Sequence, residues 1–119
     1  MSTTSKIDVW QQLPDSDPDK VLLREYAELS ESVYGQPPST WNVLGAQMML
    51  FLIDGLERSE PDPSDIQNAR NELQLALENT TDLDLLSGNY TMSSEDHYGC
   101  NWQKLILVTY RDGEMIYLP

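Results

Sequence analysis

Residues 40–58, TWNVLGAQMMLFLIDGLER, decide the fold, because this stretch is apolar almost throughout. Ser39, immediately before it, is a favoured residue for the N-cap of a helix. The spacing predicts a helix whose apolar side chains cover most of its circumference: Trp41, Val43, Leu44, Met48, Met49, Leu50, Phe51, Leu52, Ile53 and Leu56. A helix of that kind is buried on more than one side. We therefore expect it at the centre of the structure.

A second helix is predicted before it, over residues 18–34. Asp17 suits its N-cap and Pro18 its first turn, where no amide donor is needed. Gly35 suits the position just after the last turn. Its apolar residues recur at spacings of three and four and predict one buried stripe: Leu22, Tyr26, Leu29 and Val33.

A third helix is predicted after the central one, over residues 63–79, with Asp62 or Ser64 as its cap. One face is apolar and the other polar, which places this helix at the surface. The apolar stripe consists of Ile66, Ala69, Leu73, Ala76 and Leu77.

Beyond Gly88 the pattern is typical of strands. Residues 90–92 form a short candidate, residues 93–101 a polar loop, and residues 105–110 a strong strand. Asp112-Gly113 predicts a tight type I′ turn into a return strand over residues 115–118. Two helices and a two-stranded hairpin provide too little apolar surface to enclose the central helix. We therefore expect a β-sheet beside these elements that this chain does not contain.

Composition narrows the function. The chain has 119 residues, enough for one domain, and a net charge of −13, which disfavours binding to nucleic acids and to anionic membranes. The same charge is compatible with cationic ligands or a basic partner. No run of about 18 apolar residues predicts a membrane span. Residues 1–6 are polar and do not form a secretory signal, and we expect residues 1–8 to be disordered.

The sequence predicts no catalytic residue, metal site or cofactor. His97 follows Glu95 and Asp96, but a metal site needs three convergent ligands, and this is the one histidine in the chain. We interpret the segment as a loop held by hydrogen bonds from its side chains to its backbone, with Gly99 closing a turn. Cys100 is interpreted as a half-buried thiol rather than a nucleophile. The chain is therefore predicted not to be an enzyme.

The order of these features resembles the C-terminal portion of the type 1 periplasmic solute-binding proteins of ABC transporters, the leucine/isoleucine/valine-binding type. The resemblance covers residues from about Val9 to Tyr117. It depends on an ordered series of segments rather than on one motif: residues 13–18, 34–40, 55–58, 76–80, 87–93, 95–99 and 112–113. Complete members of this family have two Rossmann-like α/β lobes, joined by hinge strands, with the solute held between them.

The resemblance implies an α/β fold in which residues 1–119 are a single incomplete domain, a partial lobe of three helices followed by a short strand and a C-terminal β-hairpin. It implies a non-catalytic segment that binds an amino acid or similar small solute only with a complementary lobe, and an ABC permease as partner. Trp41, Leu44 and Tyr90 are the candidates for ligand or hinge contact. The family often carries an aromatic-Asp pair where this chain has Ala46-Gln47, which puts ligand contact from that helix in doubt.

The resemblance also implies a periplasmic or extracellular location, whereas the sequence as given, lacking a signal peptide, would stay in the cytoplasm. The chain would then be a fragment, a gene remnant, or a product that pairs with another chain. One alternative stays open. In this alternative, the chain is a stand-alone acidic interaction domain. It pairs through its apolar central helix with a partner, or with a second copy as a homo-oligomer.

Overall fold

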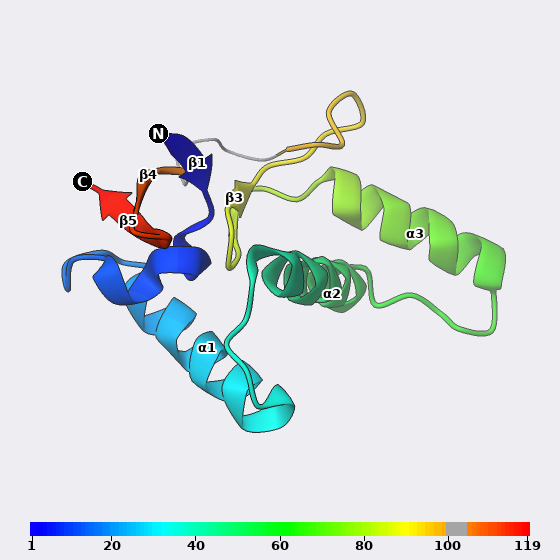
Figure 1. The fold of residues 1–119 in the computed structure, drawn as a ribbon. Helices are drawn as coiled ribbons and strands as arrows, with labels where there is room; N and C mark the ends of the chain where they lie inside the picture. Colours follow the sequence, from blue (N-terminus) through cyan, green and yellow to red (C-terminus); the bar gives the residue numbers. More distant parts are fainter. Residues whose placement is uncertain (100–104) are drawn as a thin grey trace.

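The computed structural model describes residues 1–99 and 105–119, and the prediction for Cys100 lies outside them. Figure 1 shows an elongated molecule, 56 Å in its longest dimension, with a small sheet at one end and two helices at the other. The elements in chain order are β1 (Ser2–Thr4), the 3₁₀ helix η1 (Lys6–Gln12), α1 (Lys20–Tyr34), α2 (Thr40–Ser59), α3 (Ile66–Glu78), β2 (Leu83–Asp84), β3 (Asn89–Tyr90), β4 (Ile106–Arg111) and β5 (Glu114–Leu118).

The main sheet joins the two ends of the chain. Its order is β1-β4-β5 and its strands are antiparallel, with Thr4 opposite Ile106 and Val108 opposite Tyr117. The expectation of disorder over residues 1–8 is therefore wrong. β1 satisfies its backbone groups along the edge of β4, and η1 buries Ile7 immediately afterwards.

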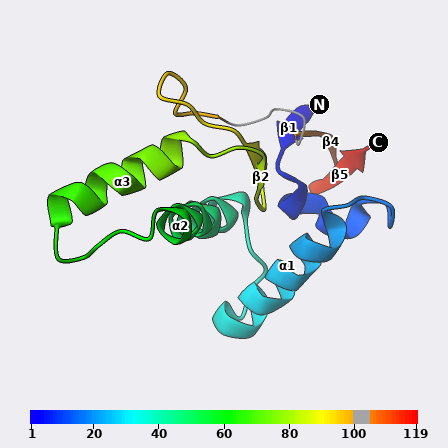
Figure 2. The ribbon, with the colours of Figure 1, turned by 180° about the vertical axis from the view of Figure 1, so that it is seen from behind.

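The hairpin β4–β5 has the predicted turn. Asp112 has a φ of 52° and Gly113 a φ of 87°, so both central residues adopt the left-handed conformation that a type I′ turn requires. β2 and β3 form a second, smaller antiparallel pair, in which Leu83 lies opposite Tyr90. Figure 2 shows this pair between the main sheet and α2.

Helix α1 exists as predicted but buries a different face. Leu23, Ala27 and Ser30 are buried, whereas Leu22 and Leu29 are exposed. Of the predicted stripe, only Tyr26 packs against the core, and Val33 is also exposed. The helix begins at Lys20 rather than at residue 18, because Asp17 accepts a hydrogen bond from the Asp19 amide and holds the preceding residues in a turn.

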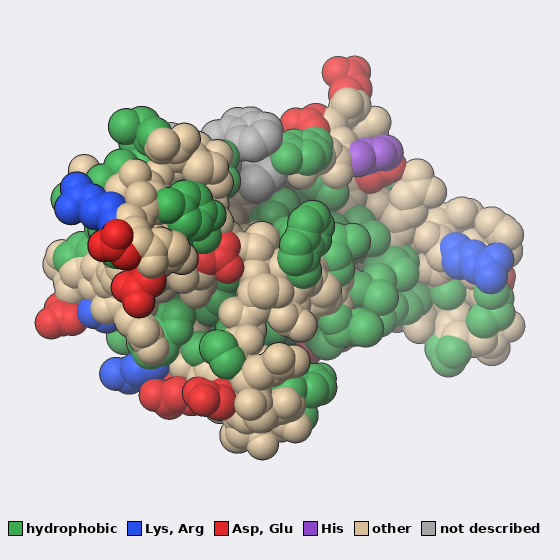
Figure 3. All heavy atoms as spheres, in the orientation of Figure 1, with side chains coloured by type: hydrophobic (Ala, Val, Ile, Leu, Met, Phe, Trp, Pro, Cys, Tyr) green, Lys and Arg blue, Asp and Glu red, His purple; other side chains and the backbone are tan. Residues whose placement is uncertain are grey.

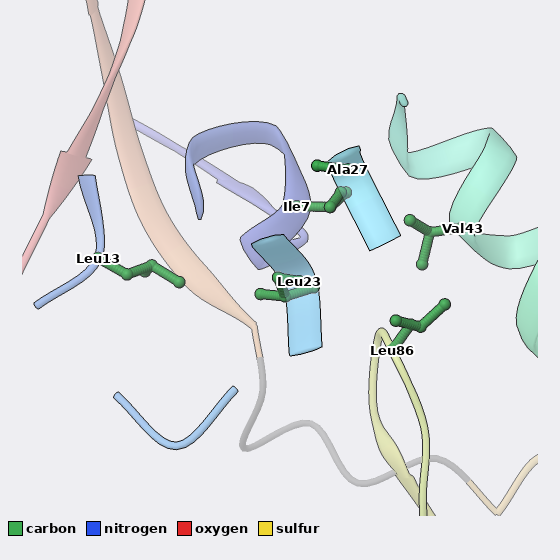
Figure 4. Close-up of a cluster of buried hydrophobic side chains, with 6 residues drawn as sticks. All are labelled: Ile7, Leu13, Leu23, Ala27, Val43 and Leu86. Carbon is green, nitrogen blue, oxygen red and sulfur yellow. The ribbon is translucent and has the colours of Figure 1, made fainter. Parts of the chain in front are cut away.

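The core is small and draws on five parts of the chain (Figure 4). Ile7 comes from η1, Leu13 from the following segment, Leu23 and Ala27 from α1, Val43 from α2, and Leu86 from the β2–β3 turn. Each of these side chains is less than a tenth exposed. The core therefore fixes the N-terminal part of α2 against η1, α1 and the β2–β3 pair.

Helix α2 begins as predicted. Asn42 Oδ1 accepts hydrogen bonds from the Ser39 amide (2.9 Å) and the Ser39 hydroxyl (2.8 Å), which confirms Ser39 as the N-cap. One side of α2 packs on α3, where Gly55 lies so close to Leu77 that a Cβ atom would be 2.6 Å from its Cδ2.

Much of the remaining surface of α2 is uncovered. Exposed apolar side chains occupy much of it (Figure 3): Trp41, Met48, Met49, Leu50, Leu52, Ile53 and Leu56. Burial of α2 on more than one side is therefore not achieved within the described residues. This agrees with the expectation that the chain alone cannot enclose this helix.

Helix α3 starts three residues later than predicted. Asp65, not Asp62 or Ser64, is its N-cap, and its side chain accepts a hydrogen bond from the Asn68 amide at 3.1 Å. Asp62 instead accepts a hydrogen bond from the Ser64 amide in the preceding turn. No residue of α3 is fully buried, in keeping with its predicted surface position.

Candidate functional site

A hollow of about 560 Å³ lies where β1, the N-terminal half of α2, the β2–β3 pair and the loop after β3 meet. Its walls carry hydroxyl, amide, phenol, imidazole, thioether and aliphatic groups. The described lining residues are Thr3, Thr4, Ser5, Thr40, Leu44, Gln47, Met48, Ser87, Tyr90, His97, Tyr98 and Leu105. This mixture of apolar surface and a few fixed polar groups is what small-molecule sites offer.

Gln47 organises the polar wall of this hollow. Its side chain is 4% exposed and projects from α2 toward the β2–β3 pair. The Nε2 group donates to the Tyr90 hydroxyl at 2.8 Å, and Oε1 accepts hydrogen bonds from the Ser87 amide (3.1 Å) and the Ser87 hydroxyl. Because a buried amide must be hydrogen-bonded, these bonds fix both Tyr90 and the β2–β3 turn relative to α2.

The start of α2 forms the opposite rim. Asp8 of η1 accepts hydrogen bonds from the Thr40 amide (3.2 Å) and the Thr40 hydroxyl (2.7 Å). The Thr4 hydroxyl donates to the same carboxylate. Asp8 therefore places a negative charge at the positive end of α2 and ties β1 to that helix. Next to Thr4, the Ser5 hydroxyl is buried and has no hydrogen-bond partner among the described residues.

Lys6 anchors the segment behind this rim. Its ammonium group lies 2.9 Å from the Asp17 carboxylate and 2.6 Å from that of Asp19. Burial acts to lower the pKa of Lys6, but the hydrogen bonds and charges of the two aspartates outweigh burial and raise this pKa above 10.5. The ion pairs hold η1 against the start of α1, so Asp8 of η1 and Ser5 before it are positioned from both sides.

The loop over residues 91–99 closes the hollow on the side of α3. Asp96 Oδ1 accepts hydrogen bonds from the amides of Tyr98 (2.9 Å) and Gly99 (3.1 Å), and Gly99 has a φ of 54°. These bonds confirm the interpretation of this segment as a loop held by its own side chains. His97 Nε2 lies 3.3 Å from Glu78 Oε1 of α3. No group of three metal-ligating side chains occurs within residues 1–99 and 105–119.

The structure brings together two of the three residues predicted to contact a ligand. Leu44 and Tyr90 both line the hollow. Trp41 is 81% exposed and stands outside its described walls. The sequence interpretation missed Ser87 and Ser5, and it noted Gln47 only as a departure from the family pattern. A polar residue in the middle of the apolar run 40–58 was the signal that could have identified Gln47.

The fold superposes on about one third of the length of solved extracellular ligand-binding receptors. A solved structure of Rhodopseudomonas palustris, Rp1789, superposes with a TM-score of 0.82 at 20% identity, covering 98% of this chain and 33% of that protein. A structure described as an extracellular ligand-binding receptor from R. palustris HaA2 superposes with a TM-score of 0.80 at 17% identity, again over 98% and 33%. Another structure described as an extracellular ligand-binding receptor from R. palustris HaA2 superposes with a TM-score of 0.74 at 20% identity. This superposition also covers 98% of this chain and 33% of that protein.

These superpositions establish the fold and confirm the architecture expected from the sequence, a part of a periplasmic-binding-protein-like α/β structure. The chain spans about a third of the length of these solved structures. No family model matches the sequence, and no curated protein matches it either. Within the described residues, no helix has the length and hydrophobicity needed to cross a membrane.

Proposed function

We propose that this chain is a non-catalytic segment of a two-lobe ligand-binding receptor and that the hollow beside Gln47 is its part of the solute site. The observation that carries the proposal is the buried hydrogen-bonded cluster of Gln47, Ser87 and Tyr90 in the wall of a hollow. The fold shared with extracellular ligand-binding receptors supports it. Leu44 and Tyr90 would contact the solute, and Trp41 would contact the hinge or the rest of the receptor.

The uncovered face of α2 supports the same proposal. Apolar surface of this extent normally packs against another element, and the superposed receptors are three times as long as this chain. We propose that a sheet of the remaining receptor covers Met49, Leu52 and Ile53. The solute, an amino acid or a similar molecule, would be enclosed when the lobes close, because closure adds contacts that the open form lacks. Such a receptor would work in the periplasm or outside the cell and deliver the solute to an ABC permease.

The proposal is tested by NMR titration of the isotope-labelled chain with leucine, isoleucine, valine and phenylalanine. Half of a site is expected to bind weakly, in about the millimolar range, because each ligand atom gains less than it would in an enclosed site. Amide signals of residues 47, 87 and 90 should shift, and Gln47→Met should abolish the shifts, whereas Gln67→Met on the exposed face of α3 should leave them. If no solute shifts these signals, the hollow is not a solute site.

A second candidate function rests on the same uncovered face of α2. Met48, Met49, Leu52 and Ile53 could instead pack against a second copy of this chain. Size-exclusion chromatography with light scattering would detect a dimer. Met49→Glu should return a dimer to the monomeric state, whereas Leu29→Glu, at an exposed position of α1, should not. A monomer at high protein concentration counts against self-association.

A further inference from the structure

The charged groups in and around the hollow beside Gln47 bear on which solutes it can accept. Among the residues that the structure describes around it, none is Lys, Arg, Asp or Glu. Elsewhere in the described chain, the ammonium groups of Lys6 and Lys20 and the guanidinium group of Arg58 each lie within 3 Å of a carboxylate. His97 also lines the hollow, and its Nε2 lies 3.3 Å from Glu78 Oε1, so an anionic solute would meet no unpaired cation among the residues described around it.

The start of α2 is the feature of this hollow that would ordinarily attract an anion. A helix N-terminus carries a partial positive charge and unpaired amides. Here Asp8 already accepts the Thr40 amide and hydroxyl, and Asn42 and Ser39 form the cap. The carboxylate of Asp8 thus replaces the anion that such a terminus could bind. The carboxylate of Asp8 therefore adds negative charge to the rim. The chain as a whole also has a negative net charge, −13.

Acceptor groups and aromatic rings complete the walls. Four residues that carry hydroxyl groups, Thr3, Thr4, Ser5 and Ser87, line the hollow, and so do Tyr90 and Tyr98. Oxygen acceptors and ring faces both favour an ammonium group. The Ser5 hydroxyl, at a residue that lines the hollow, is buried without a hydrogen-bond partner in the described chain.

We infer that this wall of the site receives the ammonium end, or a neutral polar end, of the solute and disfavours a carboxylate. The inference rests on the proposed function and specifies its ligand class. A zwitterionic amino acid would place its carboxylate toward parts of the receptor outside this chain. Solutes of net negative charge would be poor ligands for the hollow, because the carboxylate of Asp8, bonded to the lining residues Thr4 and Thr40, repels them.

Three compounds that share a phenyl ring on a two-carbon chain test this. Phenylalanine carries both charged groups, 2-phenylethylamine lacks the carboxylate, and 3-phenylpropanoate lacks the ammonium group. NMR titration of the whole chain at neutral pH and low salt should give the tightest binding for 2-phenylethylamine, then phenylalanine, then 3-phenylpropanoate. The amine should bind at least about tenfold more tightly than the propanoate, and added salt should narrow that ratio.

The Asp8→Asn variant isolates the local charge. It should reduce the preference for the amine about threefold, since one charge at the rim is removed. Asp15→Asn removes the same charge from an exposed position beside Lys20 and should leave the preference unchanged. If Asp8→Asn fails to fold, the effect of salt on the amine-to-propanoate affinity ratio of the unmodified chain still tests the inference.

The outcomes separate this inference from the proposed function. Binding of 3-phenylpropanoate as tight as that of 2-phenylethylamine, with shifts at residues 47, 87 and 90, overturns the charge preference and leaves the hollow a solute site. A preference that salt does not change also overturns it. If none of the three compounds shifts these signals, both the inference and the proposed function are wrong.

Discussion

Replacing Gln47 by methionine tests whether this buried amide joins α2 to the β2–β3 pair. The substitution keeps a side chain of similar length but removes three hydrogen bonds, one to Tyr90 and two to Ser87. Each such bond contributes about 1 kcal/mol net to the free energy of unfolding. Burying an apolar side chain instead recovers about 1 kcal/mol. The expected loss is therefore about 2 kcal/mol, or about 8 °C in Tm for a chain of this length.

The measurement is urea unfolding followed by tryptophan fluorescence, with Gln67→Met on the exposed face of α3 as the control, expected to change stability by less than about 0.5 kcal/mol. Combining Gln47→Met with Tyr90→Phe in a double-mutant cycle should give a coupling of about 1 kcal/mol, since both changes remove the same hydrogen bond. If Gln47→Met unfolds at the same urea concentration as Gln67→Met, Gln47 does not hold the two elements together. The organisation described for the hollow is then wrong.

Three further predictions concern stability. Leu23→Ala should lower the free energy of unfolding by about 3 kcal/mol, whereas Leu29→Ala, on the exposed face of the same helix, should lower it by less than about 0.5 kcal/mol. Equal losses of the two variants in urea unfolding would contradict the face assigned to α1. The raised pKa of Lys6 means that its stabilising contribution is complete below 10.5 and is lost as the pH rises through the higher folded-state value. The difference in urea midpoint between the unmodified chain and Lys6→Met should therefore shrink above pH 10.5, and a constant difference would refute the ion-pair role. Gly113→Ala should cost about 1 kcal/mol in thermal unfolding because of its positive φ, and an unchanged Tm would argue against the type I′ turn.

Local patterns predicted the helices and the hairpin because their signals lie within each segment. Ser39 capped α2, and Asp112-Gly113 formed the turn, as their residue types indicate. The face of α1 was wrong because two adjacent rows of this helix are apolar. Periodicity alone cannot decide between Leu22 and Leu23, since the choice depends on where η1 packs.

Other features depended on pairings between distant segments. β1 has a polar sequence, so only its pairing with β4, about a hundred residues further along the chain, makes it a strand. The candidate site had the same limitation. Leu44 and Tyr90 were identified from family resemblance, but Ser87 contacts Gln47 across 40 residues, and no local pattern links them. The acidic composition, by contrast, was already seen from the sequence to be compatible with cationic ligands or a basic partner.

The position of β1 has a consequence for the order in which the chain acquires its structure. Ser2–Thr4 are synthesised about a hundred residues before their hydrogen-bonding partner, β4. Closing so long a loop is slow relative to forming a helix, so α1, α2 and α3 can form while the main sheet is still absent. During that interval the amide and carbonyl groups of β1 must remain hydrated. A nascent chain halted before residue 106 should therefore leave this segment open to proteases, and completion of the hairpin should protect it.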